Sequence, residues 1–496
     1  MSDRPIGVLS RQLLPASLAI FTTTALVAFE ALAVTAAIPE LAADLGGVAL
    51  LPWVITGYIL TSSVSTVVAG PLVDGIGARI IFRWAVGIFV AASIAAALVP
   101  TMPLMVVARV VQGAGAGLIS AVALAAVGLV YPARLISRAF AANATVWGAM
   151  GVAGPGIAAA LLTALNWRWI FLVSVPLGLL ALAAGWKVLP GPAGERNVRV
   201  DARGVFLLTV FSIAMVVGID RLDIWSAVAA VVLVAVGYLY WHHALRVETP
   251  VLRLEHLARQ PYLGLALGIG LLLAGAIAAE TYVPLYVRGA RGAGPALTAW
   301  SVLFFTVGWT LGANVAGRLV DRKPETSLTL SGFFVTVPAL IGLWASASTE
   351  APLWVIFSLL VVAGSGVGAA TNAALTLLRA ATPDQQLGRA TAAHQFARSQ
   401  GFAIGPALGG ALILLVVTRR VGNVEEVQNL LSGAVGATAG QTSGAIGDGF
   451  AVAALVGAVL AALGIGPIIG LRRSLSEQRA SRRTGRNSVT KRRVVE

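Results

Sequence analysis

The chain has 496 residues, of which 58% are hydrophobic and only 11% are Asp, Glu, Lys or Arg. Soluble domains carry about 25% charged residues, so this composition excludes a soluble enzyme, a fibrous protein and a disordered chain. The net charge is +14, and half of it lies in the tail 472–496, which has nine basic and two acidic side chains. The other basic residues occupy short loops, a pattern typical of membrane topology rather than of a nucleic-acid-binding groove.

Long apolar segments follow one another along the chain and are too long and too uniform for membrane β-strands. One membrane-spanning helix needs about 20 apolar residues, and the hydrophobic content is enough for roughly fourteen. We therefore predict an all-α polytopic membrane protein with fourteen transmembrane helices, because helices satisfy their own backbone groups in lipid. The predicted segments run over 14–38, 51–69, 80–99, 104–130, 140–165, 169–189, 205–219, 225–244, 262–287, 299–316, 328–347, 353–377, 390–417 and 450–471.

The Lys and Arg residues predict the orientation in the membrane. If the N-terminus is cytoplasmic, 28 of the 35 basic residues lie on the cytoplasmic side or at its edge, and six lie outside. The remaining one, Arg109, lies within a helix. Because basic residues concentrate in cytoplasmic loops, we expect a multi-pass protein of the cell (cytoplasmic or inner) membrane with both termini inside.

Two short motifs recur at nearly the same distance along the chain. Gly70-Pro-Leu-Val-Asp74 and Gly317-Arg-Leu-Val-Asp321 are 247 residues apart, and Gly154-Pro155 and Gly405-Pro406 are 251 residues apart. An internal repeat is typical of transporters built from two related halves. The repeat predicts a 6+2+6 architecture with two pseudo-symmetric halves.

The predicted organisation has four parts. They are a six-helix bundle over 1–189, linkers with an inserted two-helix pair over 190–261, a second six-helix bundle over 262–471, and a basic cytoplasmic tail over 472–496. The inserted pair is expected to be peripheral, because the repeat does not need it. The segment 418–449, rich in Gly, Ala and Ser, is expected to be the longest external loop.

Few ionisable residues lie inside the apolar segments, and such residues are costly and usually functional. Glu30 lies in the first segment and could carry a proton, or be a structural group hydrogen-bonded to a neighbouring helix. Arg109 needs an anionic or carbonyl partner, for which Glu30 is the obvious carboxylate, and Gln112 lies one turn away. Glu280 lies near the repeat position of Glu30 and could bind a cationic substrate, carry a second proton, or do neither.

Several motifs, taken in order, resemble those of the major facilitator superfamily, and specifically of its fourteen-helix drug:proton antiporters. The stretch Gly70–Arg79 resembles the first cytoplasmic-loop motif, although Gly75 and Ala78 stand where the family has basic residues. The stretch Arg109–Gly115 matches the Arg-x-x-Gln-Gly-x-Gly motif, and Gly148–Pro155 resembles the antiporter motif of the fifth helix. Glu30 also stands in the place of the family's first-helix acid.

The motifs and the intramembrane polar residues together define four sets of candidate site residues. The proton-coupling set is Glu30, Arg109, Gln112 and Glu280, and the antiporter-motif set is Gly148, Gly151, Gly154 and Pro155. The cytoplasmic-gate set is Gly70, Asp74, Gly77, Arg79, Asp321 and Arg322, with Arg79, Arg134 and Arg138 as candidate partners of the two carboxylates. The candidate substrate-cavity set is Trp309, Asn372, His394 and Gln395.

The resemblance implies a proton-coupled efflux transporter that exports amphiphilic or hydrophobic molecules such as drugs by alternating access. Its expected partners are that substrate, protons and the lipid bilayer, and we expect a monomer. Export of an endogenous lipid or cell-envelope precursor, and proton-coupled nutrient uptake, are the alternatives. The four histidines have no ligand spacing and no phosphate-binding loop is present, so we expect no metal, no cofactor, no nucleic-acid partner and no enzymatic activity.

Overall fold

The computed structural model describes residues 7–37, 41, 44–45, 51–191, 201–220, 224–293, 295–383, 386–422 and 439–472. Each predicted apolar segment contains an α-helix. The long helices are α1 (Leu14–Ala36), α3 (Leu51–Ile76), α4 (Ala78–Leu98), α5 (Met102–Val130), α6 (Ala133–Ala164), α7 (Arg168–Gly185), α8 (Ala202–Asp220), α9 (Ile224–Arg246), α11 (Tyr262–Glu280), α13 (Pro295–Leu319), α14 (Glu325–Ser348), α15 (Leu353–Ala381), α16 (Leu387–Val421) and α18 (Ala439–Leu463). Three short helices accompany them: α10 (Glu255–Ala258), α12 (Val283–Leu285) and the π-helix η2 (Tyr286–Ala290).

Eleven helical stretches of the described part are long and apolar enough to cross a membrane. Two shorter apolar stretches, Gly57–Val73 and Ala202–Met215, lie in α3 and α8. The chain is therefore a multi-pass helical membrane protein.

The helix ends depart from prediction where polar side chains pack against protein. Residues 418–449 do not form one external loop, because α16 continues to Val421 and α18 begins at Ala439. Alanine favours helix, and Ser443 of α18 donates a hydrogen bond to the Ala290 carbonyl at 2.9 Å. Hydropathy alone does not detect such a helix start.

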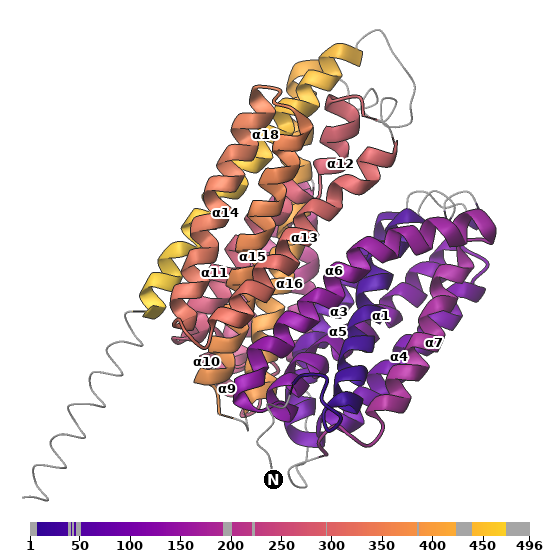
Figure 1. Ribbon diagram of the computed structural model, residues 1–496, viewed down its shortest axis with the longest axis vertical. Helices are drawn as coiled ribbons and strands as arrows, with labels where there is room; N and C mark the ends of the chain where they lie inside the picture. Colours follow the sequence, from indigo (N-terminus) through magenta and orange to yellow (C-terminus); the bar gives the residue numbers. More distant parts are fainter. Residues whose placement is uncertain are drawn as a thin grey trace, which may run out of the picture.

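The long helices other than α8 and α9 form two bundles that lie beside each other in Figure 1. In the first, α1 packs on α6 and α7, α4 packs on α5 and α7, and α3 packs on α5. In the second, α11 packs on α16 and α18, α14 packs on α15 and α18, and α13 packs on α15. The same five pairings therefore occur in both bundles, in the same order along the chain.

Two helix pairs, α3 with α16 and α6 with α13, form most of the contact between the bundles, and α5 with α16 and α6 with α15 add smaller contacts. We call this joint the seam. Gly70 of α3 lies so close to α16 that an added Cβ would be 2.8 Å from the Ala392 Cβ. Across the other pair, Asn314 Nδ2 donates to Thr145 Oγ1 at 2.8 Å. In Figure 1 the bundles meet toward the end that carries the N-terminus and diverge toward the opposite end.

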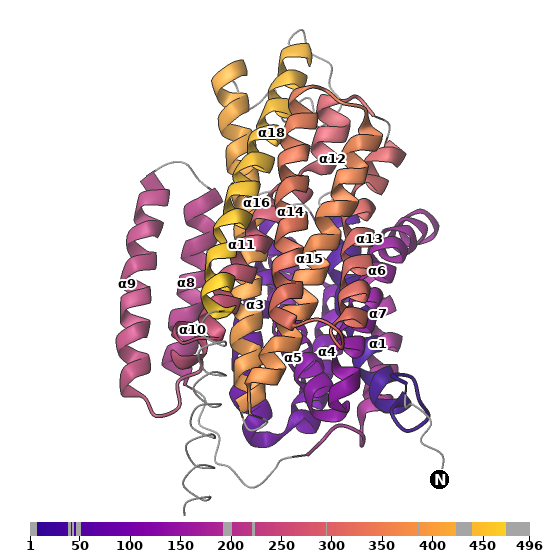
Figure 2. The ribbon, with the colours of Figure 1, turned by 60° about the vertical axis from the view of Figure 1, so that its left-hand side comes forward.

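The inserted pair α8 and α9 covers the seam rather than lying apart from both bundles. Figure 2 shows α8 beside the bundles and α9 outside it. Gln400 of α16 donates hydrogen bonds to Ser63 of α3 at 3.1 Å and to Ser212 of α8 at 3.3 Å. One apolar cluster contains buried side chains of all four helices: Val67 of α3, Leu207 and Leu208 of α8, Val236, Tyr240 and Ala244 of α9, and Ala393 and Phe396 of α16. The pair lies on the outside of the bundles, and its buried apolar side chains pack against α3 and α16.

Candidate functional site

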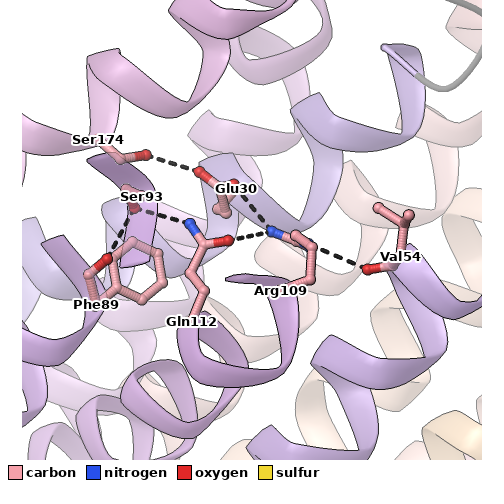
Figure 3. A network of polar contacts seen from close by, with 7 residues as sticks. All are labelled: Glu30, Val54, Phe89, Ser93, Arg109, Gln112 and Ser174. Carbon is pink, nitrogen blue, oxygen red and sulfur yellow. Dashed lines mark hydrogen bonds and ion pairs between the residues drawn. The ribbon is translucent and has the colours of Figure 1, made fainter. Parts of the chain in front are cut away.

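A charged pair is enclosed inside the first bundle. Helix α1 supplies Glu30, which is fully buried, and α5 supplies Arg109, which is 2% exposed. The Arg109 Nη1 atom lies 3.0 Å from the Glu30 Oε1 atom (Figure 3). A buried charge is tolerated when it is paired and hydrogen-bonded, so each residue makes the burial of the other possible.

The remaining contacts of Arg109 hold its guanidinium in one orientation. Its Nε donates to the Val54 carbonyl of α3 at 3.1 Å, and its Nη1 also donates to Gln112 Oε1 at 2.6 Å. The guanidinium carbon lies 4.1 Å from the centre of the Tyr58 ring, within the range of a cation–π interaction. The aromatic face and the carbonyl compensate in part for the lost hydration of the cation.

Two serines complete the network, and neither was predicted. Ser174 of α7 donates to Glu30 Oε2 at 2.8 Å. Gln112 Nε2 donates to Ser93 of α4 at 2.8 Å, and Ser93 in turn donates to the Phe89 carbonyl at 2.9 Å (Figure 3). The only sequence signal for them is that each is a polar residue inside an apolar run. The network joins α1, α3, α4, α5 and α7.

This arrangement is compatible with both ionisation states of Glu30. With Glu30 ionised, its carboxylate accepts from Arg109 and Ser174, and both charges are neutralised. With Glu30 protonated, Arg109 keeps Gln112 and the Val54 carbonyl as acceptors. The cation therefore remains hydrogen-bonded in both ionisation states of the acid.

Glu280 lies apart from this network. It is the last residue of α11, and its side chain is half-buried. Among the residues that the structure describes, no basic side chain forms an ion pair with it. The structure therefore does not bring the two predicted intramembrane acids together.

The glycines of the predicted antiporter motif pack across the seam. An added Cβ at Gly148 would lie 2.0 Å from Thr310 Oγ1, and one at Gly151 would lie 2.7 Å from Thr306 Cγ2. Gly154 is buried, and the side chain of Pro155 lies outside the described residues. Small residues let helices approach closely, and here they seat α6 against α13.

The candidate gate residues do not form one cluster. Gly77 immediately precedes α4 and has a φ of 94°, a backbone conformation that favours glycine. Arg79 donates from Nε to the Leu189 carbonyl at 2.7 Å, so it bonds within its own bundle. The Asp74 side chain lies outside the described residues.

One candidate gate residue does reach the other bundle. Asp321 Oδ2 lies 3.5 Å from Arg138 Nη2 of α6, and both side chains are at least half exposed. Arg322 is exposed beside it, after the end of α13. A single exposed ion pair contributes about 0–1 kcal/mol, so this pair adds little to the contact between the bundles.

The candidate cavity residues lie in different surroundings. Asn372 is buried in the seam, where its Oδ1 accepts from Ser137 of α6 at 3.1 Å. Trp309 of α13 stacks with Phe402 of α16, with ring centres 6.1 Å apart. His394 is 3% exposed. Gln395 accepts a hydrogen bond from Arg398 of the same helix at 2.7 Å.

The fold and this site define a polytopic α-helical membrane protein with two related bundles and an ion pair enclosed in one of them. The chain belongs to the Major Facilitator Superfamily, whose family description it matches over residues 20–406. Proteins of this superfamily are membrane transporters and not enzymes.

Curated relatives are similar over most of this chain. An MFS-type transporter of Mycobacterium tuberculosis is 28% identical over 81% of this chain, which spans 59% of that relative's length. The multidrug transporter protein MdtP of Bacillus subtilis is 24% identical over 80% of this chain and 74% of the relative. The tetracenomycin C resistance and export protein of Streptomyces glaucescens is 26% identical over 83% of this chain and 77% of the relative.

Solved structures of the superfamily share the fold. The human organic anion transporter MFSD10 aligns with a TM-score of 0.63 at 12% identity, over 92% of this chain and 99% of that chain. The proton:xylose symporter XylE aligns with a TM-score of 0.60 at 14% identity, over 90% of this chain and 94% of that chain.

Proposed function

We propose that this protein is a proton-coupled exporter of the fourteen-helix antiporter type, arranged as 6+2+6. It would move amphiphilic or hydrophobic small molecules out of the cell across the cytoplasmic membrane. The names of two relatives, a multidrug transporter and a tetracenomycin C resistance and export protein, support export. The enclosed Glu30–Arg109 pair is the observation that carries the proton-coupling part of the proposal.

In this proposal Glu30 is the proton carrier and Arg109 sets how readily it gains and loses the proton. A carboxylate inside the membrane can release its proton only if its charge is compensated, and Arg109 provides that compensation. Gln112, Ser93 and Ser174 are positioning residues, because they hold the two charged groups in register. Glu280 is a second candidate, for a proton or for a cationic substrate.

The proposed transport cycle alternates the two bundles about the seam. With both termini in the cytoplasm, the contacts at Gly70, Ser137 and Asn372 lie toward the cytoplasmic side, and the described arrangement is closed there. Opening of this joint would break the Ser137–Asn372 hydrogen bond and separate Arg138 from Asp321. The Gly148 and Gly151 contacts would act as the pivot, because they lie further along the same helix pair.

Transport in proteoliposomes with an imposed pH gradient tests this function. The probes are ethidium (a cation), N-phenyl-1-naphthylamine (neutral) and 8-anilinonaphthalene-1-sulfonate (an anion). Antiport predicts that at least one probe moves against the proton flow, whereas a symporter would move it in the same direction. Glu30→Gln is expected to abolish the coupling, and Glu30→Asp is expected to keep part of it.

Matched variants separate this role from general damage. Glu248→Gln removes an exposed acid that follows the end of α9 and is expected to transport like the wild type. Glu280→Gln tells whether the second acid is also needed. If Glu30→Gln transports the same probe at the wild-type rate with the same pH dependence, Glu30 is not the carrier.

A further inference from the structure

Arg398 is a half-buried cation that has no anionic partner among the residues the structure describes. It lies eleven residues after the start of α16, about 16 Å along the helix, where an ionisable side chain is costly and indicates function. No carboxylate among the described residues lies within ion-pair distance of it. Its Nη1 donates to Gln395, and its Nε is buried with no hydrogen-bond partner. Arg109, by contrast, is paired with Glu30.

The same face of α16 also carries an aromatic side chain. Gln395, Arg398 and Phe402 are spaced i, i+3 and i+7 and so lie on one face of the helix. Phe402 and Trp309 are nearly parallel, with 18° between their rings. His394, one turn before Arg398, is 3% exposed, and neither ring nitrogen has a hydrogen-bond partner within the described part of the chain. Polar groups free to bond and a pair of stacked rings are therefore adjacent.

These side chains belong to α13 and α16, two helices that contact the first bundle. Trp309 lies between Thr306 and Thr310 in α13, the two residues that contact Gly151 and Gly148 of α6. Helix α16 also meets the first bundle, chiefly through α3. A molecule held between Arg398 and the Trp309–Phe402 stack would touch two helices of this bundle that meet the other one.

We propose that Arg398, Gln395, Trp309 and Phe402 form a binding subsite for the anionic group and ring of an aromatic organic anion. The guanidinium would hold a carboxylate or sulfonate through charge-assisted hydrogen bonds, and the rings would stack on the aromatic body. An uncompensated cation disfavours a cationic ligand at the same place. The inference rests on the proposed export function and narrows its substrate class.

Equilibrium binding to the full-length protein in lipid nanodiscs tests the subsite. The probes are 8-anilinonaphthalene-1-sulfonate and its neutral counterpart N-phenyl-1-naphthylamine, with fluorescence corrected for empty nanodiscs. The wild type is expected to bind the anion at least ten-fold more tightly than the neutral probe. Arg398→Gln is expected to weaken the anion at least ten-fold and to leave the neutral probe within two-fold. Phe402→Leu is expected to weaken both.

Arg398→Lys keeps the positive charge, so it serves as a second variant in case Arg398→Gln does not fold. It is expected to bind the anion three- to ten-fold more weakly than wild type, because one ammonium replaces a bidentate donor, and still to prefer it over the neutral probe. Wild-type binding of the anion in either Arg398 variant, or an equal loss of both probes, overturns the proposal. Displacement by octanesulfonate as effective as by a naphthalenesulfonate would overturn the aromatic part.

The binding assay is independent of transport. If Glu30→Gln loses pH-driven transport while the anion preference is absent from wild type, only the subsite fails. If the anion preference depends on Arg398 while no probe is transported, the export function fails and the subsite stands.

Discussion

Gln400 of α16 donates a hydrogen bond to Ser63 of α3, joining side chains that are 337 positions apart and belong to different bundles. The same amide donates to Ser212 of α8 at 3.3 Å. Three helices from three parts of the chain therefore meet at one side chain. The inserted pair is hydrogen-bonded to the seam, the joint that opens in the proposed transport cycle.

Replacing Gln400 with Leu is expected to favour separation of the bundles. A hydrogen bond between membrane helices contributes about 0.6 kcal/mol on average, which changes a population ratio roughly three-fold for each bond lost. The chain has no cysteine, so cysteines placed at Ser137 and Asn372 can report closure. The rate at which a short bifunctional thiol reagent cross-links them should fall about three-fold or more.

Thr209→Val is the matched control for that experiment. Thr209 also lies on α8, but its hydroxyl donates to the Val205 carbonyl of its own helix at 2.8 Å. Its removal should leave the cross-linking rate unchanged. Equal rates in Gln400→Leu and wild type would mean that the inserted pair does not hold the seam.

Gly70→Ala is expected to force α3 and α16 apart. The new Cβ would lie 3.0 Å from the Arg389 Cα and 3.1 Å from the Gly388 carbonyl oxygen, and backbone atoms cannot rotate away. A single cysteine at Ser137, which is 3% exposed, should then react several-fold faster with a water-soluble maleimide. Gly87→Ala in α4 is the control, since no heavy atom lies within 4 Å of its added Cβ. A similar increase in both variants would contradict a specific contact.

Arg109→Gln is expected to destabilise the fold by about 3–5 kcal/mol, because it leaves the Glu30 carboxylate buried without its cation. The double variant Glu30→Gln/Arg109→Gln should lose less than the sum of the two single changes, since neither charge is left unpaired. Unfolding in denaturant measures both. Arg138→Gln, at an exposed pair, should cost less than about 1 kcal/mol. Strictly additive losses would mean that the pair does not act as a unit.

The contacts of Asp44 with Trp167 and Arg168 lie outside the membrane spans, and we expect their contribution to stability to depend on pH. The Trp167 indole N–H at 3.0 Å and the Arg168 guanidinium at 2.8 Å lower the pKa of its carboxyl below the ordinary 3.8. The ionised form therefore stabilises the fold above the ordinary pKa, and this contribution is lost as pH falls through the lowered value. Asp44→Asn should lower the melting temperature at pH 7, and the difference from wild type should vanish in stronger acid. A constant difference across that range would contradict the assignment.

Much of the architecture followed from the sequence, because lipid requires long apolar helices and few residues can be charged within them. Every predicted segment contains a helix, and the partnership of Arg109 with Glu30 followed from their being the two opposite charges of one half. Helix ends were missed at Ala133 and Ala439, where polar residues pack on protein rather than facing lipid. Arg398 is one of the 28 basic residues counted on the cytoplasmic side or at its edge, because hydropathy does not distinguish a polar residue leaving the bilayer from one that packs against other helices.

The sequence by itself determined that this is a helical membrane protein with a repeated plan and an acid and a base inside one half. Only the tertiary structure decided that Ser93 and Ser174 bond to that pair, that α8 covers the seam, and that no carboxylate of the described ranges pairs with Arg398. The reason is physical: lipid tails are as apolar as the helix faces, so hydrophobicity does not favour one neighbouring helix over another. The choice of neighbour therefore depends on close packing and on single polar contacts between distant segments.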